Sequence, residues 1–134
     1  MSLLVLGVSH RTAPMSVLDA FAFDAPAVEQ LRSRVCAGEY VMGVVVLATC
    51  NRVEIIADVS GFHGGLADLG SALVDMTSFD WKELAGHLFV RYETEAYEHL
   101  FELTTGLDSM AIGEAQILGQ VRTALNEALS LIHI

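Results

Sequence analysis

Apolar residues fall into four short blocks along the chain, and each block has the length of a β-strand. The blocks cover residues 3–9, 41–48, 52–59 and 87–92. The second block is a continuous apolar run broken only by Gly43, whereas the third alternates between apolar and polar positions. Successive side chains of a strand point to opposite faces, so this alternation predicts one core-facing side. The residues expected on that side are Val53, Ile55, Ala57 and Val59.

Apolar residues spaced three and four positions apart predict helices between these strands. The first helix follows Asp24, a good N-cap, has Pro26 in its first turn, and stops near Gly38. The expected apolar stripes are Val28, Leu31 and Val35 in this helix, and Leu66, Leu69, Leu73 and Met76 in the next. Further helices are expected at about residues 81–85, 95–105 and 113–130.

The order strand, helix, strand, strand, helix, strand is the split βαβ arrangement. It predicts an α+β domain with a ferredoxin-like βαββαβ sheet that carries helices on one face and is followed by two C-terminal helices. The length of 134 residues suits one domain with its own core. We therefore expect a single unit over residues 1–134.

Composition restricts the partners of this domain. There are 17 acidic residues against 7 basic ones, a net charge of −10, and the basic residues are scattered. Phosphate backbones require clustered Lys and Arg, so we expect the chain by itself to bind nucleic acid poorly. Two cysteines without a disulfide framework fit a reducing cytoplasm. No zinc-ligand spacing occurs, and no apolar run approaches the roughly 20 residues of a membrane helix.

Cys50 carries the clearest chemical signal, because it lies at the turn between residues 41–48 and 52–59. If the second of these segments is a strand, then Cys50, Arg52 and Glu54 project to the same side. A nearby guanidinium favours the thiolate, and it can also bind a carboxylate with two hydrogen bonds. The hypothesis is a cysteine nucleophile acting on a substrate that has a carboxylate. The alternative, an inert core thiol, is disfavoured by the polar neighbours of Cys50.

Three segments give the chain a resemblance to a known family. They read GVSHRTAP at 7–14, LATCNRVE at 47–54 and GLDSMAIGEAQILGQV at 106–121. With these motifs the chain resembles the N-terminal catalytic domain of glutamyl-tRNA reductase, in the five-carbon route to tetrapyrroles. The resemblance implies that a cysteine thiolate attacks the aminoacyl ester to form a thioester. Hydride from NADPH then releases glutamate 1-semialdehyde.

The resemblance also implies roles for particular residues. Cys50 matches the family's nucleophile, and His99 is a candidate acid or base, with a structural helix histidine as the alternative. Arg52 is expected to bind the glutamyl carboxylate, although it could instead be a surface arginine paired with Glu54. Glu114 is a candidate for the ammonium group, although acidic residues also favour first helical turns.

Other residues are expected at the edge of the same pocket. Ser109 could hydrogen-bond the substrate or cap the following helix. Thr49 and Gln116 are expected to line the pocket, and backbone N–H groups of Cys50 and Asn51 are candidate oxyanion donors. No metal site is expected.

In the family, an NADPH-binding domain and a dimerising helical domain follow the catalytic one. This sequence has no Gly-x-Gly-x-x-Gly fingerprint, so we expect no cofactor site in it. The helix expected from about residue 113 would lead toward the NADPH-binding domain. The implied partners are glutamyl-tRNA, a second subunit bound through another domain, and the next enzyme, an aminomutase. Two other readings are open: a regulatory or partner-binding ferredoxin-like module, and a free-standing cysteine hydrolase.

Overall fold

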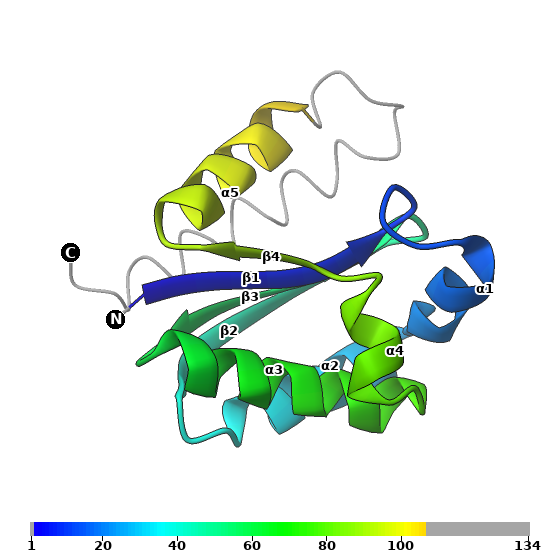
Figure 1. Cartoon of the computed structure of the whole chain (residues 1–134), viewed down its shortest axis with the longest axis horizontal. Coiled ribbons are helices and arrows are strands. Elements are labelled where there is room, and N and C mark those ends of the chain that lie inside the picture. Colours follow the sequence, from blue (N-terminus) through cyan, green and yellow to red (C-terminus); the bar gives the residue numbers. More distant parts are fainter. Residues whose placement is uncertain (1, 107–134) are drawn as a thin grey trace.

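A computed structural model of the chain describes residues 2–106, in which a four-stranded antiparallel sheet has helices on both faces (Figure 1). The strands are β1 (Ser2–Ser9), β2 (Val41–Ala48), β3 (Arg52–Val59) and β4 (Phe89–Tyr92). The helices are α1 (Met15–Leu18), a 3-10 turn (Asp19–Phe21), α2 (Ala25–Cys36), α3 (Phe62–Thr77), α4 (Trp81–Ala85) and α5 (Thr94–Gly106). The helix expected at about 113–130 lies outside the described residues.

The strand order confirms the ferredoxin-like prediction. It runs β2-β3-β1-β4, with β1 antiparallel to both β3 and β4, and β3 antiparallel to β2. The connection from β1 through α2 to β2 steps over β3, and the connection from β3 through α3 to β4 steps over β1. Two such interleaved crossovers are the split βαβ arrangement.

The alternation in β3 divides the core into two layers. Val53, Ile55, Ala57 and Val59 pack in one cluster with Leu31 and Val35 of α2 and Leu69 and Leu73 of α3, as their spacing predicts. The sequence predicted helices on one face of the sheet, but α5 covers the other face as well. There Ala96, Leu100 and Leu103 pack with Leu3, Val5 and Ile56. The sheet is therefore buried on both sides, which makes any polar group of β3 that faces α5 a buried one.

Local signals explain where the elements begin and end. The carboxylate of Asp24 accepts the N–H of Ala27 at 2.9 Å and caps α2 as expected. The expected last strand started at residue 87, but β4 begins at Phe89 because the N–H of His87 donates to the carbonyl of Leu84 and closes α4. The short helix α1 was not predicted, since four residues are too few for a periodic stripe.

Gly7 occupies the centre of a row of residues that crosses the sheet. In the strand register it lies between Glu54 of β3 and Phe89 of β4, and Leu47 of β2 completes the row. A Cβ atom on Gly7 would lie 2.5 Å from the Phe89 ring and 3.0 Å from Cγ of Glu54. The absence of a side chain at Gly7 thus makes room for both neighbours.

Gly7→Ala is expected to lower the free energy of unfolding by about 1–3 kcal/mol, because the added methyl must displace the Phe89 ring. The comparison is Gly43→Ala in β2, where an added Cβ meets nothing within 4 Å. Urea unfolding of both variants measures the difference. Equal stabilities would contradict the close packing at Gly7.

Asp58 is a carboxylate on β3 that is only 8% exposed. Burial raises the pKa of Asp58 above its usual range. A raised pKa in the folded state favours folding at acidic pH, and this contribution is lost as the pH rises through the folded value. At neutral pH the charged form of Asp58 therefore lowers the free energy of unfolding.

Asp58→Asn is expected to raise the unfolding midpoint at pH 7, because the amide removes the buried charge. The increase in the unfolding midpoint should shrink as the pH falls toward about 4, the usual pKa of aspartate. Thermal unfolding at both pH values tests this, with the exposed Asp19→Asn as control. A gain that is the same at both pH values would exclude the ionisation of Asp58 as its cause.

Candidate functional site

A buried carboxylate, Glu54, organises the polar residues under α5. Its side chain is fully buried, with 0% exposure. One carboxylate oxygen lies 2.5 Å from Nε2 of His99, and the other accepts a hydrogen bond from Nη1 of Arg52 at 3.3 Å. A buried carboxylate without partners would be very costly, so these two contacts account for its presence between sheet and helix.

The contact with Glu54 sets the state of the His99 ring. An ionised carboxylate only accepts hydrogen bonds, so the ring form of His99 that suits an ionised Glu54 carries a hydrogen on Nε2 and leaves Nδ1 for proton transfer. The side chains of His99 and Arg52 are each 19% exposed. Glu54 therefore holds two partly accessible groups, one basic and one cationic, while remaining inaccessible itself.

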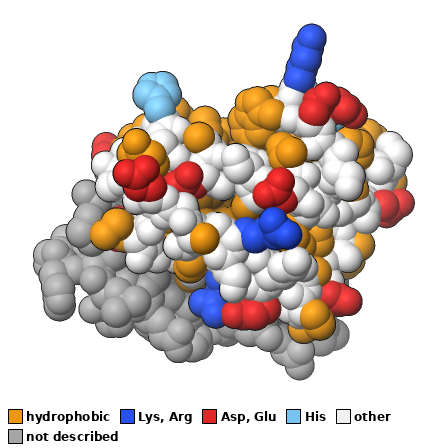
Figure 2. Space-filling view, turned by 90° about the horizontal axis from the view of Figure 1, so that it is seen from below, with side chains coloured by type: hydrophobic (Ala, Val, Ile, Leu, Met, Phe, Trp, Pro, Cys, Tyr) orange, Lys and Arg blue, Asp and Glu red, His pale blue; other side chains and the backbone are white. Residues whose placement is uncertain are grey.

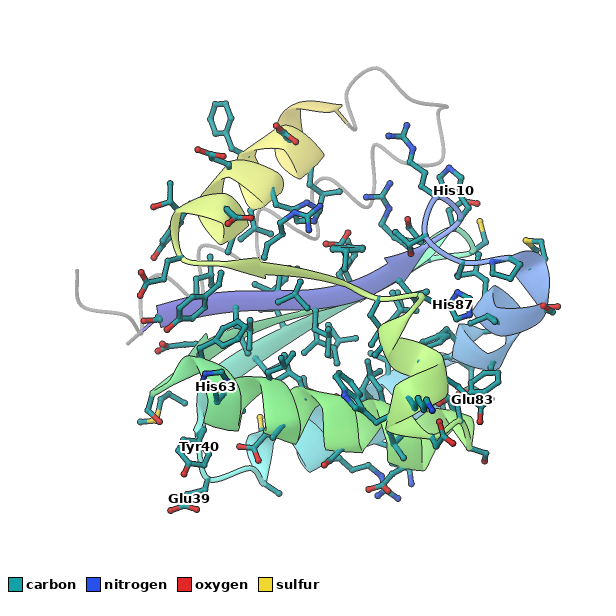
Figure 3. All side chains as sticks on the ribbon, in the orientation of Figure 1. His10, Glu39, Tyr40, His63, Glu83 and His87 are labelled. Carbon is teal, nitrogen blue, oxygen red and sulfur yellow. The ribbon has the colours of Figure 1, made fainter. Side chains whose placement is uncertain are left out.

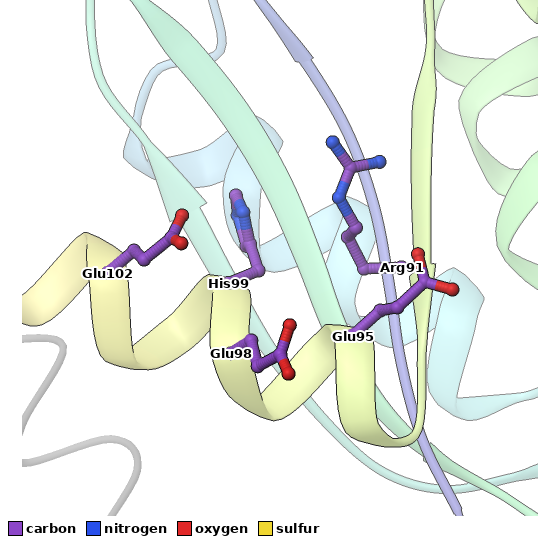
Figure 4. Close-up of a pocket in the computed structure, with 5 residues that line it drawn as sticks. All are labelled: Arg91, Glu95, Glu98, His99 and Glu102. Carbon is purple, nitrogen blue, oxygen red and sulfur yellow. The ribbon is translucent and has the colours of Figure 1, made fainter.

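A small hollow lies beside His99 between β4 and α5 (Figure 4). Its volume is about 150 Å³. The other residues that line it are Arg91, Glu95, Glu98 and Glu102. The His99 ring also packs on Phe89, with ring centroids 5.2 Å apart, and the guanidinium of Arg91 lies 5.4 Å from the centre of the same Phe89 ring. Most of the lining side chains are carboxylates, so the hollow repels anions.

The turn between β2 and β3 presents Cys50 to solvent. Cys50 is exposed, and the turn is closed by the N–H of Thr49 donating to the carbonyl of Arg52 at 2.8 Å. The hydroxyl oxygen of Thr49 accepts the N–H groups of Asn51 at 3.1 Å and Arg52 at 3.2 Å. The hydroxyl of Thr49 thus holds the turn in shape.

This hydrogen bonding narrows the choice of oxyanion donors. The N–H of Asn51 was one candidate, but Thr49 already occupies it within the turn. The N–H of Cys50 has no partner among the hydrogen bonds of the described residues. It is therefore the N–H of the turn that remains for a ligand.

The structure brings several of the predicted residues together. Arg52, Glu54 and His99 form one connected set, and Cys50 lies two residues before Arg52, at the same end of the sheet. Ser109, Glu114 and Gln116 lie outside the described residues, and their roles stay predictions. The sequence indicated Glu54 only as a partner of Arg52. Its contact with His99 joins positions 45 residues apart, which spacing alone could not reveal.

Away from Glu54 and its partners, the described residues line a second hollow. Hydrophobic, acidic and basic side chains are interspersed on the face seen in Figure 2. A hollow of about 510 Å³ lies between α3 and α4, across the sheet from His99, lined by His63, Leu66, Ala67, Gly70, Ser71, Val74, Asp75, Asp80 and Trp81. Within residues 2–106, no group of three His, Cys, Asp or Glu side chains could hold a metal ion. Each helix between residues 2 and 106 is too short or too polar to span a membrane.

Comparisons with known proteins agree on one family. Residues 6–132 match the family model of the glutamyl-tRNA(Glu) reductase N-terminal domain. The chain is 50% identical over 125 residues to the glutamyl-tRNA reductase of Kineococcus radiotolerans, covering 93% of this chain and 28% of that protein. The corresponding protein of Frankia casuarinae is 49% identical over 124 residues, covering 92% of this chain and 26% of the relative.

A solved structure supports the same assignment. The glutamyl-tRNA reductase from Methanopyrus kandleri matches with a TM-score of 0.60 and 32% sequence identity, over 96% of this chain and 28% of that one. The chain thus spans little more than a quarter of the relatives that it matches.

Proposed function

The chain belongs to the family of glutamyl-tRNA reductase N-terminal domains, and from this premise we propose that it is the thioester-forming domain of an NADPH-dependent glutamyl-tRNA reductase. The complete reaction converts glutamyl-tRNA to glutamate 1-semialdehyde for tetrapyrrole synthesis. The observation that carries the proposal is the connected set of Arg52, Glu54 and His99, at the end of the sheet that exposes Cys50.

In the first step, the Cys50 thiolate attacks the carbonyl carbon of the aminoacyl ester. A carbon–sulfur bond forms, and the bond between that carbon and the 3′ ribose oxygen breaks. His99 acts as the general acid: its doubly protonated ring gives the proton on Nδ1 to the departing ribose oxygen and is left neutral, with its remaining hydrogen on Nε2 toward Glu54. The oxygen charge that develops on the carbonyl is stabilised by the N–H of Cys50.

Arg52 selects the substrate in this scheme. One of its nitrogens already contacts Glu54, and a guanidinium has five N–H donors in a fixed fork. The remaining donors bind the side-chain carboxylate of the glutamyl group. We also propose Glu114 for the ammonium group, and Ser109 and Gln116 as pocket residues with Thr49 and Asn51.

The reductive step is assigned to another part of the full-length protein. The sequence has no Gly-x-Gly-x-x-Gly turn for dinucleotide phosphates, so its residues do not fit NADPH. A homodimer formed through a further domain, and a contact with the aminomutase that takes the aldehyde, complete the proposal for the whole enzyme.

The test is to incubate the protein with glutamyl-tRNA in the absence of NADPH. We expect a glutamyl adduct that peptide mass mapping places on Cys50, together with slow release of glutamate as water hydrolyses the thioester. A ferredoxin-like binding module needs no reactive thiol. Absence of both adduct and release, with glutamyl-tRNA present in excess, would favour that module over the enzyme.

A further inference from the structure

The loop after β1 is fixed to the turn that carries Cys50. The N–H of His10 donates to the carbonyl of Asn51 at 3.0 Å. The N–H of Arg11 donates to the hydroxyl of Ser9 at 3.2 Å, and Ser9 lies opposite Arg52 in the strand register. Figure 1 shows this loop and the β2–β3 turn at the same end of the sheet, and Figure 3 places His10 there.

Arg11 differs from most other cations of the described chain. Arg32 pairs with Glu29, Arg34 with Asp75, and Arg52 with Glu54. Arg11 is exposed and takes part in no ion pair among residues 2–106. Two other cations of residues 2–106 also have no ion pair there. Lys82 is exposed but lies on α4, which packs against α3 on the other side of the sheet from His99. Arg91 is only half exposed, because its guanidinium lies over the Phe89 ring and donates to the carbonyl of Val90.

The hydrogen bond between the two loops bounds the distance from Arg11 to the nucleophile. Arg11 directly follows His10, and Cys50 directly precedes Asn51. Consecutive Cα atoms are about 3.8 Å apart, so the Cα atoms of Arg11 and Cys50 lie within roughly 15 Å of each other. The long Arg11 side chain can cover much of that separation.

The proposed substrate carries a phosphate close to the ester that Cys50 attacks. In an aminoacyl-tRNA, one ribose separates the reacting ester from the last phosphodiester. The chain has a net charge of −10, and carboxylates line the hollow on the α5 side of His99. A phosphate approaching Cys50 is repelled along α5 and attracted by the unpaired guanidinium beside the turn.

Resting on the proposed function, we propose that Arg11 is a positioning residue that binds a phosphate of the 3′-terminal nucleotides of tRNA and so places the ester over Cys50. The contact explains how an acidic domain can accept a nucleic-acid end without a basic surface. It requires one cation at the right place rather than a patch.

The experiment compares Arg11→Gln with Lys82→Gln, which removes the same charge on the α3 side of the sheet. Binding of uncharged tRNA is measured between about 50 and 200 mM salt. Rates of Cys50 acylation are measured with glutamyl-tRNA and with glutamate esterified to the 3′ oxygen of adenosine, which has no phosphate.

For Arg11→Gln we expect about tenfold weaker tRNA binding at low salt, and a salt dependence that is shallower by about 0.7, the value of one single-strand phosphate contact. The ratio of the glutamyl-tRNA rate to the adenosine ester rate should fall about tenfold. Lys82→Gln should alter each quantity less than twofold.

The outcomes separate this inference from the proposed function. If wild-type Cys50 is acylated but Arg11→Gln behaves as Lys82→Gln does, the phosphate contact is wrong and the enzyme assignment stands. If Arg11→Gln slows both substrates equally, Arg11 supports the turn and binds no phosphate. If Cys50 is never acylated while Arg11→Gln still weakens tRNA binding, the contact stands and the proposed chemistry fails.

Discussion

Cys50→Ser is expected to abolish acyl transfer from glutamyl-tRNA, with a loss of about 10³-fold or more in adduct formation and in glutamate release. In the proposed mechanism the nucleophile is the thiolate of Cys50, whereas a serine hydroxyl in the same exposed turn stays protonated at neutral pH. Fold stability should change little, because Cys50 is exposed and its turn is held by Thr49 rather than by the thiol.

The matched control for Cys50→Ser is Cys36→Ser. Cys36 is also an exposed free thiol, but it ends α2, away from the turn. Its replacement should leave both rates within about twofold. Glutamate release that persists in Cys50→Ser, or that disappears in Cys36→Ser, would rule out Cys50 as the nucleophile.

Glu54→Gln is expected to slow acylation of Cys50 about 100-fold, at the lower end of what a positioned acid or base contributes. The neutral amide keeps the shape of the side chain but replaces the carboxylate oxygen that contacts Nε2 of His99. It can also turn its NH2 group toward Nε2 and so favour the wrong tautomer of the ring. Because the side chain is fully buried, the unfolding free energy of this variant must be measured beside its rate.

A double-mutant cycle shows whether Glu54 acts through His99. If it does, Glu54→Gln combined with His99→Gln should be no slower than His99→Gln alone, because the two residues work as one unit. Losses that multiply would mean that Glu54 serves catalysis independently of His99, through Arg52 or through the packing around Gly7. Rates with the phosphate-free ester keep tRNA binding out of the comparison.

Much of the fold could be predicted because its elements are local. The alternation in residues 52–59 assigned the core-facing side chains of β3 correctly, and Asp24 and the α2 stripe gave the helix start and its buried face. The order of strands and helices then indicated a split βαβ sheet. Each of these features depends on residues a few positions apart, where periodicity and capping act directly.

The chain sequence also determined the candidate nucleophile. Cys50 between Thr49 and Asn51 reads as a turn, and the structure exposes it there. The same local argument put Arg52 and Glu54 on one face of the strand, and their 3.3 Å contact agrees with it.

What only the tertiary structure decided is the environment of that face. α5 packs over it, so Glu54 becomes a fully buried carboxylate and its second oxygen meets His99. Gly7 makes room for this arrangement from a third strand, and the loop after Ser9 brings Arg11 to the Cys50 turn. These contacts join residues that are far apart in sequence. Both faces of the sheet are buried, so a charged side chain there is shielded from water and can pair only with the groups that pack against it.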